Sequence, residues 1–303
     1  MRKEQHAQSI RETVQKLSND DSLKILCNSQ QEGAPMPSAK ELHEIIELCR
    51  SIIFPGYFGH SRVDSDTLPY HLGVNSERLF KLLTEQILAG LCSECGCKEG
   101  INIGECRDKA KDISSEFVAS LPELRRVLAT DVIAAYNGDP AAESYSEVIF
   151  CYPAIRAISN YRIAHRLMEL GVPLIPRIIS EMAHSETGID IHPAATIGEY
   201  FTIDHGTGVV IGATAILGNN VKLYQGVTLG AKSFPLDENG NPIKGIARHP
   251  IIGDNVIIYS NATILGRITI GEGAVIGGNI WITEDVASGE VVTQSKAKQR
   301  KDK

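Results

Sequence analysis

The sequence predicts an α+β protein in which an all-helical N-terminal domain is followed by a parallel β-helix of hexapeptide repeats. Two observations carry this prediction. Upstream of about residue 185, apolar residues recur at spacings of three and four, as on the buried faces of amphipathic helices. Near the C-terminus, isoleucine recurs at every sixth position, namely at Ile252, Ile258, Ile264, Ile270, Ile276 and Ile282.

A period of six fits neither an amphipathic helix nor a single alternating strand. It fits a β-helix, in which each repeat supplies one short strand and one corner, and its apolar residue points into a shared core. A β-sandwich is the alternative, but its strands do not keep a sixfold spacing through their loops. The same period occurs upstream in two runs displaced by two residues: Ile191, Ile197, Ile203 and Val209, then Ile211, Leu217, Leu223 and Leu229.

Glycine often follows the apolar position of a repeat, and we expect it to supply corners with positive φ. Asparagine tolerates the same backbone region. The glycines are Gly198, Gly212, Gly218, Gly230, Gly253, Gly271 and Gly277, and the matching asparagines are Asn219, Asn220 and Asn261.

In the N-terminal part, apolar spacing and end signals predict four helices. We expect them from a cap at Asn75–Ser76 to Gly90, over 122–138, over 155–170, and over 175–182. The segments around 30–37 and 54–66 are rich in glycine, proline and polar residues and are predicted to be loops.

The organisation predicted from these patterns is a helical domain over residues 1–188, a β-helix domain over 189–290 and a polar tail over 291–303. The sixfold ladder breaks after Leu229 and resumes at Ile252, so seventeen extra residues leave the coil. They form an extended loop over 233–250. A long excursion from a regular scaffold is a common place for function, and a neutral surface insertion is the alternative.

Composition limits the classes of function. A net charge of −7 and a pI of about 5.7 give little support to nucleic-acid binding. No stretch reaches the roughly 18 apolar residues needed to span a bilayer, and the N-terminus lacks an apolar signal segment. Seven cysteines are an odd number and indicate a reducing compartment. We therefore expect a cytoplasmic protein with no membrane and no nucleic-acid partner.

Four of the cysteines are clustered, at Cys92, Cys95, Cys97 and Cys106. Their spacing could hold zinc or a redox disulfide, or the thiols could have no ligand at all. The spacing matches no standard zinc signature and no histidine lies nearby, so we expect no metal.

His205 is the strongest candidate for proton transfer, since a histidine can accept a proton near neutral pH. It needs a carboxylate to orient it, and Asp190 lies fifteen residues upstream. One coil of a three-sided β-helix takes about eighteen residues, so the two should be close on adjacent coils. The alternative for His205 is a structural corner histidine. His192, followed by a proline, is the competing histidine and suggests a turn.

Arg248 and His249 end the long loop, and the planar guanidinium of an arginine suits a carboxylate. Three histidines in a β-helix also suggest a γ-type carbonic anhydrase, but the solenoid has no close histidine pair to bind zinc. P-loop, dinucleotide-binding and nucleophile-elbow motifs are absent from the sequence.

Five motifs stand out beside the sixfold ladder: Gly138–Ala141 and Tyr161–Arg166 in the helical part, and Asp190–Ala195, Asp204–Gly208 and Arg248–Pro250 in the solenoid. Together, these motifs resemble serine O-acetyltransferases over about residues 120–285. The resemblance implies a left-handed β-helix and trimers, often paired into hexamers, with active sites between neighbouring solenoids. It also implies transfer of acetyl from acetyl-CoA to L-serine in cysteine biosynthesis.

Residue by residue, the resemblance makes His205 the general base, oriented by Asp190, for direct attack of the serine hydroxyl on the thioester. The remaining assignments concern binding. Arg248 and His249 should hold the serine carboxylate, Asp139 and Asp204 its amino group, and Gly230, Ala231, Ser260 and Gly278 should line the CoA groove.

Three departures from the family pattern limit what the resemblance implies. The usual glycine-rich loop is replaced by a longer one with Pro235 and Pro242, and Ala247 stands where an aspartate often precedes Arg248. L-Cysteine is expected as a feedback inhibitor, although the altered loop leaves its strength open. The tail ends in Lys303 rather than an isoleucine that docks into cysteine synthase, which puts that complex in doubt. Another hexapeptide acyltransferase with a different hydroxyl acceptor, or a non-catalytic scaffold, remains the alternative.

Overall fold

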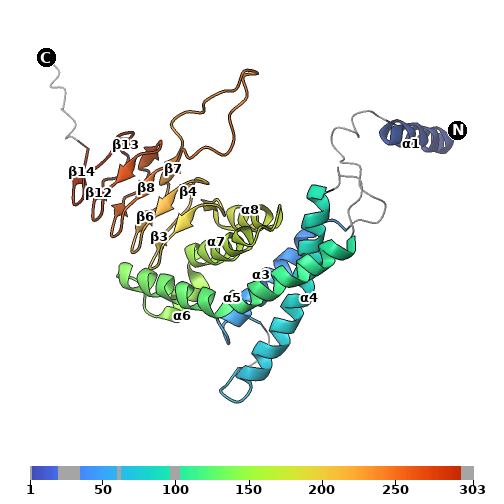
Figure 1. Ribbon diagram of the computed structural model, residues 1–303, viewed down its shortest axis with the longest axis horizontal. Coiled ribbons are helices and arrows are strands. Elements are labelled where there is room, and N and C mark those ends of the chain that lie inside the picture. Colours follow the sequence, from blue (N-terminus) through green and yellow to red (C-terminus); the bar gives the residue numbers. More distant parts are fainter. Residues whose placement is uncertain (1, 20–34, 60–62, 96–102, 295–303) are drawn as a thin grey trace.

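The computed structural model describes residues 2–19, 35–59, 63–95 and 103–294 (Figure 1). Helices occupy the N-terminal part and short parallel strands the C-terminal part, which confirms the predicted α+β class. The helices are α1 (Arg2–Asn19), α3 (Ala39–Ile53), α4 (Leu68–Cys95), α5 (Ile103–Gly138), α6 (Tyr145–Cys151), α7 (Pro153–Glu169) and α8 (Ile175–Thr187).

Two helices are longer than the sequence signals predicted. Helix α4 begins at Leu68, ahead of the proposed caps, and continues through Gly90. Gly90 therefore does not end the helix. A Cβ there would come within 2.9 Å of the Pro173 carbonyl, so the glycine permits close packing of the chain before α8. Helix α5 begins at Ile103 and carries Pro122 in its interior rather than at its start. At Gly90, tertiary packing overrides a local end signal.

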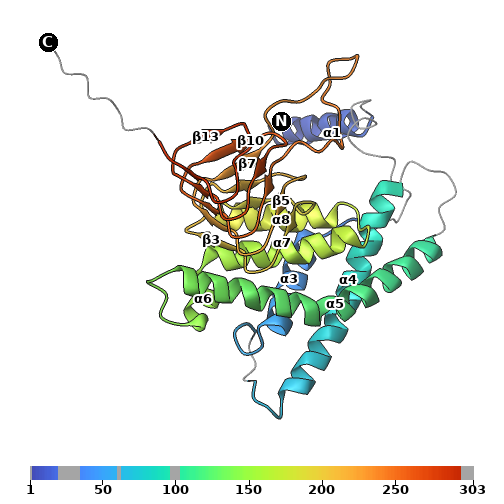
Figure 2. The same cartoon turned by 60° about the vertical axis from the view of Figure 1, so that its left-hand side comes forward.

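The strands stack into three parallel sheets that form the sides of a prism, consistent with the expected left-handed β-helix (Figure 2). The first sheet contains β1 (Asp190–Ile191), β4 (Val210–Ile211), β7 (Thr228–Gly230), β10 (Thr263–Leu265) and β13 (Trp281–Ile282). The second contains β2 (Thr196–Ile197), β5 (Ile216–Leu217), β8 (Ile251–Ile252) and β11 (Thr269–Ile270). The third contains β3 (Thr202–Asp204), β6 (Lys222–Tyr224), β9 (Ile257–Ile258), β12 (Val275–Ile276) and β14 (Val291–Val292).

Strand register explains the two irregularities of the sequence ladder. Asp190 lies opposite Val210, twenty residues later, whereas Val210 lies opposite Thr228, eighteen residues later. The first coil is therefore two residues longer, as the displaced ladder predicted. Thr228 lies opposite Thr263, thirty-five residues later, because the long loop leaves the coil between them. The ladder residues from Ile191 to Ile276 are 7% exposed or less and form the solenoid core.

The glycines that follow the ladder positions do not have the positive φ expected of them. They are needed because the next coil passes too close for a side chain. A Cβ on Gly198 would lie 2.6 Å from the Gly218 carbonyl oxygen, and one on Gly271 would lie 2.5 Å from the Ser288 nitrogen. Positive φ is found instead at Asn220 and Asn261, as predicted, but not at Asn219.

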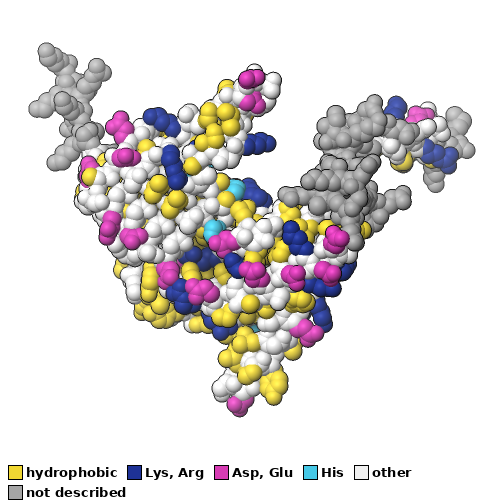
Figure 3. Space-filling model, in the orientation of Figure 1, with side chains coloured by type: hydrophobic (Ala, Val, Ile, Leu, Met, Phe, Trp, Pro, Cys, Tyr) yellow, Lys and Arg dark blue, Asp and Glu magenta, His cyan; other side chains and the backbone are white. Residues whose placement is uncertain are grey.

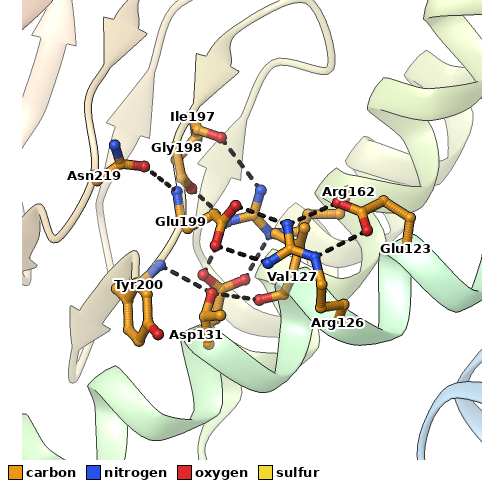
Figure 4. Close-up of polar contacts among 11 residues, drawn as sticks. Glu123, Arg126, Val127, Asp131, Arg162, Ile197, Gly198, Glu199, Tyr200 and Asn219 are labelled. Atoms are coloured by element: carbon orange, nitrogen blue, oxygen red, sulfur yellow. Dashed lines mark hydrogen bonds and ion pairs between the residues drawn. The ribbon is translucent and has the colours of Figure 1, made fainter.

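A buried polar network joins α5 and α7 to the first coil of the β-helix (Figure 4). Arg162 donates to both carboxylate oxygens of Asp131, at 2.6 and 2.9 Å, and to the carbonyls of Ile197 and Gly198. Burial raises the pKa of Asp131 above its ordinary value, although Arg162 lowers it. At the exposed edge of the network, Arg126 pairs with Glu199 at 2.7 Å.

Two further predictions concern the helical part. Of the clustered cysteines, Cys92 is buried on α4 and Cys106 is partly buried on α5. The Cys95 side chain and Cys97 lie outside the described residues. Within the part of the chain that the structure describes, no helix is long and apolar enough to cross a membrane.

Candidate active site

The candidate site residues gather at two different corners of the prism. The His205 corner lies between the third and first sheets and carries Asp190, Asp204, His205, Ser260 and Gly278. The His249 corner lies between the first and second sheets and carries Gly230, Ala231, Arg248 and His249. Within one chain, the proposed base and the proposed carboxylate-binding pair are therefore separated by the width of the first sheet.

At the first of these corners, the two extra residues of the first coil push the histidine outward. His205 has a left-handed backbone with φ of 58°, and its side chain is 74% exposed. Its Nε2 lies 3.8 Å from a carboxylate oxygen of Asp204.

Asp190 lies at the same corner, one coil away from His205. Among the described residues, no hydrogen bond or ion pair joins the two side chains. The Asp190 carboxylate instead lies within 4.8 Å of ligand atoms of Glu181 and His184 on α8. The structure thus brings Asp190 to the corner of His205 without pairing the two.

Asp139 reaches this corner from the turn after α5. Its carboxylate accepts a 2.5 Å hydrogen bond from the Tyr152 hydroxyl and one of 2.8 Å from the Ala141 amide. The Tyr152 hydrogen bond, followed by that amide, lowers the pKa of Asp139 below its ordinary value. Lys222 connects the turn to the solenoid, because it donates to the Gly138 carbonyl at 2.6 Å and lies 3.8 Å from Asp204. Two carboxylates, those of Asp139 and Asp204, therefore lie near the Lys222 ammonium at this corner.

At the second corner, His249 is 6% exposed, and its ring lies against Gly212. A Cβ at residue 212 would meet the ring at 2.0 Å, so only glycine fits there. The imidazole Nδ1 accepts a hydrogen bond from the Thr214 amide at 3.0 Å. Burial, with the charges of Arg248 and Arg267, lowers the pKa of His249 below its ordinary value and so favours the neutral ring.

Arg248 lies beside this ring at the end of the long loop. Its guanidinium lies 5.5 Å from the ring centroid of Phe234, within cation–π range, and its buried Nε has no partner. The loop projects from the solenoid and presents exposed hydrophobic side chains, including Phe234, Leu236 and Ile243 (Figure 3). Exposed apolar residues next to an arginine indicate a surface that a further molecule covers.

The residues expected to line the CoA groove divide between the same two corners. Ser260 and Gly278 are neighbours on adjacent coils, and a Cβ on Gly278 would lie 3.0 Å from the Ser260 carbonyl. Gly230 ends β7 and Ala231 follows it into the loop. The residues expected to bind acetyl-CoA are therefore split between the His205 corner and the His249 corner, as are the residues expected to bind the acceptor.

Sequence reasoning missed several polar residues that hold the candidates in place. Tyr152, Thr214 and Lys222 each contact a candidate residue or its backbone. None lies in a recognisable motif, because each acts across a turn or a coil. His192 accepts a hydrogen bond from the Ala194 amide at Nδ1, which agrees with its interpretation as a turn residue.

The chain matches the model of the family described as "Bacterial transferase hexapeptide (six repeats)" over residues 249–279. A plasmid serine acetyltransferase of Synechococcus elongatus is 50% identical over 265 residues, covering 86% of this chain and 83% of that protein. The serine acetyltransferase of Bacillus subtilis is 44% identical over 185 residues, covering 58% of this chain and 81% of that protein.

The structure is also similar to solved structures of serine acetyltransferases. Entamoeba histolytica serine acetyltransferase 1 in complex with L-cysteine superposes with a TM-score of 0.72 at 36% identity. The match covers 84% of this chain and 96% of that chain. Neisseria gonorrhoeae serine acetyltransferase in complex with serine superposes with a TM-score of 0.53 at 28% identity, covering 85% of this chain and 96% of that chain.

Proposed function

Because this chain belongs to the serine acetyltransferase family, we propose that it transfers the acetyl group of acetyl-CoA to the hydroxyl of L-serine. The products are O-acetylserine and CoA. The observation that carries the proposal is the 50% identity to a serine acetyltransferase over most of both chains. The proposal is supported by two carboxylates, Asp139 and Asp204, at one corner and by adjacent donors, Arg248 and His249, at another, because an amino acid carries both an ammonium and a carboxylate.

In the proposed complex, Arg248 and the neutral His249 bind the serine carboxylate. Asp139 and Asp204 bind the serine ammonium. The lowered pKa of Asp139 supports this role, because it keeps the carboxylate charged throughout the neutral range. Gly230, Ala231, Ser260 and Gly278 line the groove for acetyl-CoA.

His205 then acts as the general base. Its imidazole takes the proton from the serine hydroxyl while the hydroxyl oxygen attacks the thioester carbonyl carbon. The tetrahedral intermediate collapses with cleavage of the carbon–sulfur bond, and the CoA sulfur leaves with the proton held by His205. Asp190 orients the imidazole and stabilises its charged form once a neighbouring surface closes the corner. General-base catalysis of this kind contributes about 10²- to 10⁴-fold.

We propose that this neighbouring surface is a second copy of the chain. The base and the carboxylate-binding pair lie at different corners of one solenoid, so a cyclic trimer would bring the His205 corner of one protomer to the His249 corner of the next. The exposed loop around Phe234 supports this contact. Pairing of trimers through a helical domain at residues 1–188 would leave the β-helix domain at 189–290 to carry the chemistry.

L-Cysteine is the proposed inhibitor, since it carries the same carboxylate and ammonium as serine and differs only at the side-chain atom. A related structure contains L-cysteine, which supports this reading. The altered loop of this chain sits beside the carboxylate-binding pair, so it should set the strength of inhibition.

The test is release of CoA from acetyl-CoA with L-serine, L-homoserine or a galactoside, each with and without L-cysteine. Serine-dependent release suppressed by cysteine is the expected result. CoA release only with another acceptor would show that serine is not the substrate. No CoA release with any acceptor would favour a non-catalytic scaffold. His205→Ala should lower kcat by about 10²- to 10⁴-fold with the oligomer intact. His6→Ala, on exposed α1, is the matched control.

A further inference from the structure

Thr214, in the turn between β4 and β5, holds the segment with which the long loop rejoins the solenoid. Its side-chain oxygen accepts hydrogen bonds from the backbone amides of Arg248, at 2.9 Å, and His249, at 3.1 Å. The Ile216 amide then donates to the Pro250 carbonyl at 3.2 Å, which resumes the regular stacking of coils. One hydroxyl therefore fixes the backbone of both carboxylate-binding candidates.

The same residue also fixes the ring of His249. The Thr214 amide donates to Nδ1 at 3.0 Å, and the Thr214 hydroxyl lies 2.8 Å from Nδ1. Because the hydroxyl oxygen already accepts two amide hydrogens, its own hydrogen is available to Nδ1. A nitrogen that accepts in this way carries no hydrogen, so the proton of the neutral ring is on Nε2. The ring lies on Gly212, where a side chain would displace it.

A third contact comes from the next coil. The guanidinium of Arg267 donates to the Thr214 carbonyl at 2.6 Å and to the His249 carbonyl at 3.0 Å. Thr214 and His249 are thus tied through side chain, amide and carbonyl, although they are separated by thirty-five positions in the sequence. An arrangement held on three sides is preorganised and does not have to be ordered when a ligand binds.

We propose that Thr214 is the positioning residue that gives the acceptor site its selectivity for a free carboxylate. It presents His249 as a neutral Nε2–H donor next to the guanidinium of Arg248, so that one fixed charge and one directed hydrogen bond meet the two oxygens of a single carboxylate. An acceptor with an amide in place of the carboxylate offers only one acceptor oxygen and no charge. This inference rests on the proposed acetyl transfer to serine.

The test compares L-serine with L-serinamide as acceptors for wild type, Thr214→Val and Thr214→Ser. Valine keeps the shape of threonine but removes the hydroxyl, whereas serine keeps the hydroxyl. In Thr214→Val, the ratio of kcat/KM for serine to that for serinamide should fall about tenfold or more, as for loss of a hydrogen bond to a charged ligand. Thr214→Ser should restore the ratio, and the KM for acetyl-CoA should be unchanged in both. Thr269→Val, at the exposed position of β11, is the matched control.

Equal losses with both acceptors would overturn the inference, because a general structural defect does not distinguish a carboxylate from an amide. Failure of Thr214→Ser to restore the ratio would overturn it too. Gly212→Ala is a second variant, since its methyl group pushes the His249 ring from the other side, and it should lower the same ratio. A ratio left intact in that variant would contradict the inference.

Crystal structures of wild type and Thr214→Val separate this inference from the proposed function. Absence of serine-dependent turnover in wild type would refute the proposed function. The role of Thr214 would still be decided by comparing the position of the His249 ring in the two crystal structures. Displacement of the ring from Gly212 in the variant would support positioning by Thr214. A ring in the wild-type position would overturn it.

Discussion

Arg162 on α7 and Asp131 on α5 form a buried, two-pronged ion pair whose carboxylate also accepts a hydrogen bond from the Phe201 amide in the β-helix, at 3.0 Å. The Asp131 side chain is fully buried, and that of Arg162 is 8% exposed. The pair therefore joins the helical part to the first coil, next to the strand that ends in Asp204.

Removing one partner of this pair should destabilise the protein strongly. Asp131→Ala leaves the Arg162 charge buried without a counter-ion, a change that typically costs about 3–5 kcal/mol. Urea unfolding should show this loss of free energy. Glu199→Gln is the control, because its pairing with Arg126 is exposed and should contribute much less. Equal effects of the two substitutions would contradict the burial argument.

Tyr152 should support binding of the serine ammonium through Asp139. Tyr152→Phe removes the hydrogen bond that lowers the pKa of that carboxylate and also loosens its position. The KM for serine should rise several-fold while the KM for acetyl-CoA stays unchanged. Tyr145→Phe is the control, since that side chain is exposed and its ring lies at a tilt against Tyr136, away from Asp139. A rise in both KM values would indicate general disruption instead.

Mixed oligomers test whether two chains build each site. His205→Ala and Arg248→Gln should each lose most of the activity alone, because each removes one half of the site. Co-expressed with different tags and purified through both, they should regain about a third of the wild-type activity, since each mixed cyclic trimer has one complete site among its three. Mixed oligomers as inactive as the separate variants would mean that one chain carries the whole site.

Stability should fall in acid partly through His192. Burial, followed by the charges of Arg177, His249 and Arg248, lowers the pKa of His192 from 6.5 to about 4, against a smaller opposite effect of Glu181. The folded state thus favours the neutral ring, so this contribution is complete above pH 6.5 and is lost as the pH falls towards about 4. Unfolding free energies at pH 7 and pH 5 should differ less for His192→Asn than for wild type. An unchanged difference would exclude His192 as the cause.

The β-helix was predictable from sequence because its signal is local and repeated. Each ladder residue such as Ile203 or Ile264 faces the same core, so the period survives without knowledge of contacts. The coil lengths could even be read from the displaced ladder and the seventeen-residue gap. The corner glycines were identified correctly, but for the wrong reason, because close approach between coils cannot be seen along one strand.

The candidate site was predictable only as a set of residues, not as an arrangement. His205 and Arg248 stood out by motif, yet nothing in their spacing shows that they lie at different corners of one solenoid. Thr214 gave no signal at all, since its partners are thirty-five positions away and its role depends on the register of β5 with β8. Helix ends such as Gly90 failed for a similar reason, because a neighbouring segment decided them.

The additions to the regular coil sit at corners, and the strands on either side keep their parallel register. The length of a corner loop therefore does not affect strand pairing. Strand β7 pairs with β10 in parallel register across the thirty-five-residue coil, just as β4 pairs with β7 across the eighteen-residue coil. The segment between Ala231 and Arg248 can therefore change in length or sequence without altering the strand pairing on either side. The surface beside Arg248 and His249 can then vary while the core that supports it stays the same.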